Sequence, residues 1–167
     1  MDIWELPENT YWSLFAVVEQ EPYFFQDSIR NNLDPSGCHT DQEILHVLEQ
    51  CGAIELFQER FHGDLNHIIH FDAGDLSGGE RKKLAVVRAV LKNTPIIIMD
   101  EAAADYDTMA EAHLSQMISQ NFSDKLIFYI THNYSYLDIF NRVYEISNQT
   151  LKPLTRGQVV QLKNEKV

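Results

Sequence analysis

The sequence predicts an α/β protein in which helices flank a parallel β-sheet. Three continuous apolar runs suit buried strands: Leu14 to Val18, Ile96 to Met99 and Leu126 to Ile130. Segments with a helical apolar pattern separate these runs, and strands that alternate with helices are typical of a sheet with crossover helices. Ligands of such sheets lie at the carboxyl ends of the strands, so the residues after each run are candidate site residues.

Composition limits the class of protein. The chain has 167 residues, 44% of them hydrophobic, which suits one domain or part of one with a single sizeable core. Its formal net charge of -12 argues against nucleic acid as a partner, because a phosphate-binding surface needs clustered Lys and Arg. Cys38 and Cys51 form neither a CxxC pair nor a disulfide framework. No bilayer-spanning run or signal peptide is recognisable, so we expect a cytosolic chain.

Helices are expected both before and after the second strand in the sequence. The patterns predict helices over residues 28–33, 40–51, 53–60, 80–92, 110–121, 134–140 and 157–163, and further strands over 143–146 and 151–154. Thr40 and Glu43 have the spacing of a capping box. Residues 61–75 are expected to form a loop, in which His67 and His70 could bind a metal as residues three apart but are better interpreted as solvated.

Polar groups with a possible chemical role follow the strands. Asp100 is well placed to hold a magnesium ion, usually through water, and Glu101 could orient or deprotonate an attacking water. Two solvated acids at a strand end are the alternative. His132 could bind a terminal phosphate or the attacking water, or be structural, and the amide of Gln20 could reach the metal or the water.

A glycine-rich turn precedes the helix expected over 80–92. Ser77, Gly78 and Gly79 offer a hydroxyl and unobstructed N–H groups at a helix N-terminus, which can bind an anion. The alternative is a tight turn in which Ser77 only caps the helix.

Together, the order and spacing of these groups resemble the nucleotide-binding domain of ATP-binding cassette (ABC) transporters over nearly the whole chain. The matching motifs are the Q-loop at Gln20-Glu21-Pro22, the signature motif at Leu76-Ser77-Gly78-Gly79-Glu80, the Walker B strand at Ile96 to Asp100, the D-loop at Ala104-Asp105-Tyr106-Asp107 and the switch histidine at His132. The segment Phe24 to Leu33 resembles the exporter branch of the family.

The resemblance implies a fold, ligands and partners. It implies a P-loop NTPase-like (RecA-like) parallel sheet with flanking helices from residues 1–26 and 76–167, and a helical subdomain from 27–75. ATP and Mg²⁺ would be the ligands, with Asp100 and Gln20 on the metal side and Glu101, His132 and Gln20 in catalysis. The signature motif would contact ATP held by a second cassette, in a homo- or heterodimer. A transmembrane domain would hold this dimer at the cytoplasmic face of the cell membrane.

Four departures from the family pattern stand out. Glu80 replaces the more usual glutamine, Asp105 and Tyr106 replace a small residue and a leucine, and residues 68–75 lack the acidic, glycine-containing segment of exporters. The fourth departure is the P-loop, G-x-x-x-x-G-K-[ST], because none of the seven glycines is followed by lysine and only 19 residues precede Gln20. We therefore expect a cassette that is incomplete at its N-terminus, with exposed strand edges and apolar faces.

Two functional classes stay open. The chain can be the downstream part of an ABC ATPase that drives membrane transport, shortened or completed by a second polypeptide, or a catalytically inactive module that binds a membrane domain or partner cassette. Whether it is itself an enzyme is therefore left open. The structural-maintenance ATPases share the signature and Walker B motifs, but their Q-loop lies across a long coiled coil, and this chain shows no heptads between Gln20 and Ser77.

Overall fold

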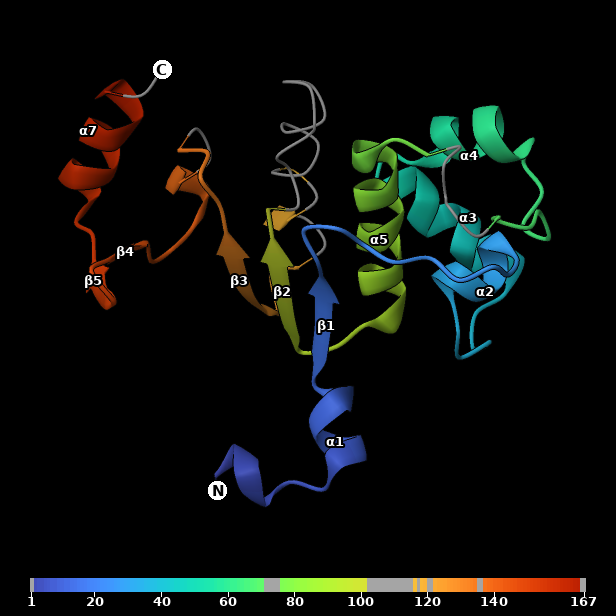
Figure 1. Ribbon diagram of the computed structural model, residues 1–167, viewed down its shortest axis with the longest axis horizontal. Coiled ribbons are helices and arrows are strands. Elements are labelled where there is room, and N and C mark those ends of the chain that lie inside the picture. Colours follow the sequence, from blue (N-terminus) through green and yellow to red (C-terminus); the bar gives the residue numbers. More distant parts are fainter. Residues whose placement is uncertain are drawn as a thin grey trace. The chain divides into compact units, whose positions relative to one another are not determined.

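A computed structural model describes residues 2–70, 76–101, 116, 118–119, 122–134 and 137–165 of the chain (Figure 1). It contains two compact units, Met1–Ile130 and Thr131–Val167. The first unit carries a parallel sheet with helices packed on it, so the predicted α/β class is confirmed. Residues 102–115, which include the D-loop expected at Ala104 to Asp107, lie outside the described residues.

The sheet of the first unit has the three predicted strands. They are β1 (Phe15–Val18), β2 (Ile96–Asp100) and β3 (Leu126–Ile130), parallel and in the order β1-β2-β3. Val17 pairs with Ile98 and Ile98 pairs with Phe128, so side chains on one face of the sheet line up across all three strands. The three strands therefore end together, which brings the residues after β1 beside those after β2.

Helices precede and follow the strands along the chain. The first unit contains η1 (Ile3–Glu5), α1 (Glu8–Ser13), α2 (Ile29–Leu33), α3 (Asp41–Gln50), α4 (Ile54–Phe61) and α5 (Gly78–Lys92). The capping box predicted at the start of α3 is present, with Thr40 and Glu43 each bonded to the other's backbone N–H. Ser28 caps α2 by accepting a hydrogen bond from the backbone N–H of Asn31.

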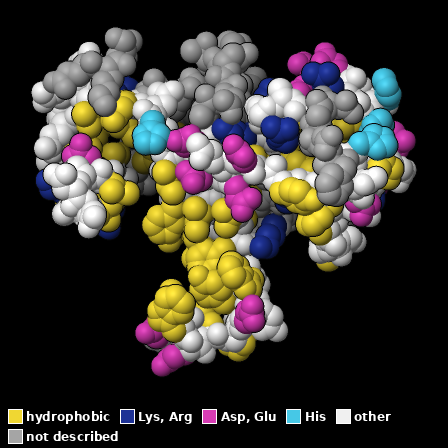
Figure 2. Space-filling model, in the orientation of Figure 1, with side chains coloured by type: hydrophobic (Ala, Val, Ile, Leu, Met, Phe, Trp, Pro, Cys, Tyr) yellow, Lys and Arg dark blue, Asp and Glu magenta, His cyan; other side chains and the backbone are white. Residues whose placement is uncertain are grey.

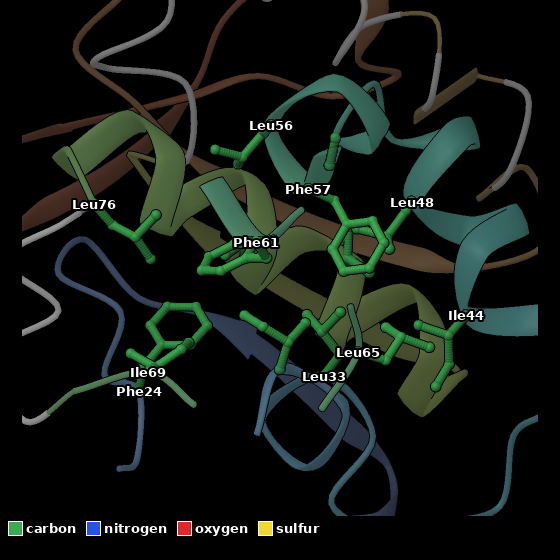
Figure 3. Close-up of a cluster of buried hydrophobic side chains, with 14 of the residues drawn as sticks. Phe24, Leu33, Ile44, Leu48, Leu56, Phe57, Phe61, Leu65, Ile69 and Leu76 are labelled. Atoms are coloured by element: carbon green, nitrogen blue, oxygen red, sulfur yellow. The ribbon is translucent and has the colours of Figure 1, made fainter. Parts of the chain in front are cut away.

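One apolar cluster joins α2, α3 and α4 to α5 (Figure 3). The side chains of Phe57, Ile44 and Leu48 are fully buried in it, as are Leu84 and Val87 of α5. The remaining members are Phe24, Ile29, Leu33, Ala53, Leu56, Phe61, Leu65, Ile69, Leu76 and Leu91. Burial of apolar surface contributes about 25 cal/mol per Å² to the free energy of folding. This cluster therefore holds α2, α3 and α4 against α5.

The two faces of the sheet differ. Ala16, Ile97 and Met99 are buried on the face toward α5, which packs on β1. On the other face, Leu126, Phe128 and Ile130 are 55%, 53% and 49% exposed, and hydrophobic side chains lie open over the strands (Figure 2). The expected exposed apolar face is therefore found.

The second unit is a small hairpin followed by a helix. Strands β4 (Tyr144–Ser147) and β5 (Thr150–Pro153) pair antiparallel, and α7 (Arg156–Glu165) follows. Asn148 and Gln149 link the strands with φ of 49° and 60°, as a two-residue hairpin turn requires. Of the helix expected over residues 134–140, the described residues form the 3₁₀ turn η2 (Leu137–Ile139), with Tyr134 and Phe140 outside it, because aromatic residues have low helix propensity.

Within the described part of the chain, no helix combines the length and the apolar character needed to cross a membrane.

Asp34 is buried at the end of α2, with 3% of its surface exposed. Its carboxylate accepts hydrogen bonds from the Ser36 hydroxyl at 2.5 Å and from the backbone N–H of His39 at 2.8 Å. Burial raises the pKa of Asp34, but these hydrogen bonds lower it further than burial raises it, so the pKa lies below its ordinary value. The ionised carboxylate therefore stabilises the turn between α2 and α3.

We expect Asp34→Asn to lower the free energy of unfolding at pH 7 by about 1.5–3 kcal/mol, because hydrogen bonds to a charged acceptor are lost. A lowered folded-state pKa stabilises above the unfolded pKa, and this contribution disappears as the pH falls through the folded pKa. The difference between wild type and variant should therefore shrink in urea titrations as the pH falls below about 4. A difference that stays constant down to pH 2 would contradict this assignment.

Candidate functional site

The turn at Leu76 to Glu80 forms the N-terminus of α5. Leu76 is 4% exposed and belongs to the apolar cluster, which fixes the start of the helix. The Ser77 hydroxyl accepts a hydrogen bond from the Glu80 N–H at 3.3 Å, and the Ser77 N–H donates to the Glu80 carboxylate at 2.6 Å. This is a second capping box, which the S-x-x-E spacing of the sequence could have predicted. The cap and the anion-binding interpretation are compatible, because a capping box leaves other N–H groups of the first turn without a partner in the helix.

Glu80 also connects the turn to α4. Its carboxylate accepts a hydrogen bond from Nε of Arg60 at 2.8 Å. Burial raises the pKa of Glu80, but the hydrogen bonds from Ser77 and Arg60 outweigh it and leave the pKa below its ordinary value. The acid that replaces the family's usual glutamine is thus held ionised, with an arginine beside it.

The second group of predicted residues lies at the carboxyl end of the sheet. Gln20 follows β1, and its Nε2 donates a hydrogen bond to Oε2 of Glu101 at 2.8 Å. Glu101 adopts φ of 47°, which is unusual for a residue with a side chain, and its N–H donates to the carbonyl of Ile130 at 2.9 Å. Asp100, the last residue of β2, is half-buried. Acidic side chains gather over this end of the strands (Figure 2).

Both groups lie toward the same end of the sheet. The Lys92 ammonium, at the end of α5, donates to the carbonyls of Trp12 and Phe15 at 3.2 and 2.7 Å, where β1 begins. The end of α5 therefore lies beside the amino end of β1, and its first residues lie toward the carboxyl ends of the strands (Figure 1). The turn at Leu76 to Glu80 and the Gln20–Glu101 pair are separate groups, and both lie toward the carboxyl ends of the strands in the first unit.

The carboxylate group has the ligand type that magnesium prefers. Asp100, Glu101 and the Gln20 amide offer oxygen atoms, and Mg²⁺ usually takes one or two carboxylates and completes its shell with water and phosphate oxygens. Among the described residues, no group of three or more His, Cys, Asp or Glu is arranged to hold a metal by itself. The residues present thus fit the protein side of a Mg²⁺–nucleotide site, whereas the sequence holds no glycine-lysine motif for the phosphates.

The histidines named as candidates lie outside both of these groups. His132 follows β3 by two residues, belongs to the second unit and is exposed, so its role stays a prediction. His67 packs on the Phe61 ring at 5.4 Å, and its carbonyl accepts from the Ile29 N–H. The His67 ring is therefore partly packed rather than fully solvated, whereas His70 is exposed.

Two residues with extensive contacts were missed by sequence reasoning. Asn32 is 1% exposed and bonds the backbone around Phe25, while Arg88 of α5 bonds the backbone carbonyls of Asn32 and Tyr23. No motif or period connects Arg88 to positions more than fifty residues earlier, so the sequence carries no local signal for this contact.

Comparison with known proteins finds relatives with an ATP-binding cassette or an ATP-dependent transport name. A family model described as "ABC transporter" matches residues 8–104. The ATP-binding cassette sub-family C member 10 of Mus musculus is 33% identical over 150 residues, which are 90% of this chain and 9% of that protein. The ATP-dependent lipid A-core flippase of Pseudoalteromonas translucida is 34% identical over 140 residues, which are 80% of this chain and 23% of the flippase. The chain thus spans about a tenth to a quarter of the length of these relatives.

We expect Ser77→Ala to lower the free energy of unfolding by about 0.5–2 kcal/mol, because the helix loses its N-cap. Ser77→Gly is the matched control, since glycine at an N-cap costs only a few tenths of a kcal/mol. Urea unfolding followed by circular dichroism measures both. An unchanged free energy of unfolding in Ser77→Ala would show that the Ser77 cap does not stabilise the helix.

Proposed function

Because this chain belongs to the ABC transporter family, we propose that it contributes the signature, Walker B and Q-loop parts of an ATP-hydrolysing cassette dimer that drives membrane transport. In this proposal its signature turn serves ATP held by a second cassette. The carboxyl end of its own sheet serves a nucleotide whose phosphates another segment holds.

The observation that carries the proposal is the 2.8 Å hydrogen bond between Gln20 and Glu101. Those side chains come from positions 81 residues apart and meet at the strand ends, beside Asp100. Asp100 would hold Mg²⁺, which supplies positive charge against the phosphates. The Glu101 carboxylate would accept the proton of an attacking water, and the Gln20 amide would orient that carboxylate.

The other proposed roles concern ATP held by the second cassette and the contacts with partner proteins. Ser77, Gly78 and Gly79 would donate hydrogen bonds to the terminal phosphate of the partner's ATP. His132 would bind the terminal phosphate or the water, and the Ala104 to Asp107 segment would contact the second cassette. Residues 27–75 would form the helical subdomain that receives a transmembrane domain at the cytoplasmic face of the membrane.

A non-catalytic interaction module is the second candidate. The exposed apolar face of the sheet favours it, because large exposed apolar patches mark interaction sites. In this case the chain would keep the surfaces of a cassette and bind a partner without supporting hydrolysis.

Mixing the chain with an intact ABC cassette should increase ATP hydrolysis, measured as phosphate release, and Ser77→Arg should abolish the increase. The arginine side chain would occupy the space in which the turn approaches the partner's nucleotide. Gln50→Arg is the control, because it adds the same charge at an exposed position of α3. Binding without stimulation in wild type would favour the interaction module, and equal loss in both variants would exclude a specific role for Ser77.

By itself, the 167-residue polypeptide should bind Mg-ATP far more weakly than a complete cassette. Backbone N–H groups and a lysine normally hold the β-phosphate, and no motif of that kind occurs in this sequence. Isothermal titration calorimetry should give a dissociation constant of about 1 mM or weaker, which is at most about 4 kcal/mol of binding free energy. A micromolar constant would contradict this expectation.

A further inference from the structure

The segment that follows Gln20 has no regular structure of its own. Residues 19–27 form neither helix nor strand, although they lie between β1 and α2. Hydrogen bonds from side chains and neighbouring loops therefore decide its conformation. The N–H of Ile69 donates to the Asp27 carbonyl at 3.0 Å, and this bond holds only the far end of the segment.

Asn32 holds the middle of the segment. Its Oδ1 accepts from the Phe25 N–H at 2.8 Å, and its Nδ2 donates to the Phe25 carbonyl at 2.9 Å. The same Nδ2 lies 3.0 Å from the Ser28 carbonyl. Asn32 is 1% exposed, and its side-chain amide bonds both the N–H and the carbonyl of Phe25. It thus supplies the hydrogen bonds that a neighbouring strand would otherwise make to this residue.

Arg88 connects this arrangement to α5. Its Nε donates to the Asn32 carbonyl at 2.7 Å, its Nη1 donates to the Tyr23 carbonyl at 3.1 Å, and its guanidinium lies 4.6 Å from the centre of the Phe24 ring. Burial lowers the pKa of Arg88, and the charge of Glu19, the residue before Gln20, opposes that shift. The arginine thus contacts the segment at several points, close to the place where it leaves β1.

From this geometry we propose that Arg88 is a positioning residue, which ties the segment after Gln20 to α5 and thereby sets the Gln20 amide against Glu101. The proposal rests on the proposed function, because it assigns the Gln20–Glu101 contact a role in hydrolysis. It adds a physical connection between the two groups of site residues. Ser77 lies at the start of α5 and Arg88 lies three turns further along the same helix, so a displacement of the turn would move the anchor of the Gln20 segment.

Arg88→Met removes the charge and both hydrogen bonds but keeps an unbranched apolar stem. Lys92→Met is the matched control, because Lys92 also bonds two backbone carbonyls from α5, at Trp12 and Phe15 rather than near Gln20. In hydrogen–deuterium exchange on the 167-residue chain, Arg88→Met should speed exchange over residues 20–28 about tenfold and leave α3 unchanged. Lys92→Met should leave 20–28 unchanged. Arg88→Lys should give an intermediate rate, and it replaces Arg88→Met if that variant does not fold.

A double-mutant cycle separates positioning from simple stabilisation. In the stimulated hydrolysis assay, Arg88→Met and Gln20→Ala should each lower kcat, and the double variant should be no slower than Gln20→Ala alone. Effects that multiply, or unchanged exchange over residues 20–28, would overturn the role of Arg88 while leaving the proposed function intact. If the wild-type chain gives no stimulation, the proposed function fails, and the exchange result alone decides whether Arg88 holds the segment.

Discussion

Burial of α5 on two sides is the constraint on which the first unit depends. Leu84 and Val87 pack into the apolar cluster of the helical block, and Ala85, Val86 and Ala89 are buried as well, in a helix that also packs on β1. A helix enclosed in this way cannot rotate or slide without opening a cavity, since protein interiors are close-packed. Apolar contacts therefore fix the body of α5, and hydrogen bonds of Ser77 and Lys92 add contacts at its two ends.

Much of the fold could be predicted because its signals are local. Continuous apolar runs identified β1, β2 and β3, and the Thr40–Glu43 spacing identified the start of α3. The two-turn helix expected over residues 134–140 was wrong in extent, because Tyr134 and Phe140 lie outside the 3₁₀ turn at Leu137–Ile139 and aromatic residues have low helix propensity. The antiparallel pairing of β4 and β5 was not predicted, although Asn148 at positive φ is a typical hairpin residue.

The candidate site also combines residues with a local sequence signal and contacts that have none. Residue type and position at a strand end pointed to Asp100 and Glu101, whereas Gln20 was named through the resemblance to the Q-loop. The structure brings Gln20 and Glu101 into hydrogen-bonding contact. The Arg60–Glu80 pair and the contacts of Arg88 could not be predicted, because they depend on how helices distant in sequence pack together. The Arg60 contact also explains why glutamate can replace glutamine at position 80, because the arginine of α4 pairs with its charge.

The exposed face of β3 has a consequence for the solution behaviour of the chain. Leu126 to Ile130 reads Leu-Ile-Phe-Tyr-Ile, a run with high β-propensity and no charge or proline, flanked by Lys125. Segments of this kind nucleate cross-β fibrils when they stay uncovered at a sheet edge, and β3 is an edge strand of the described sheet. A segment that paired with this edge would satisfy the free backbone groups of β3 and so close that path to cross-β assembly.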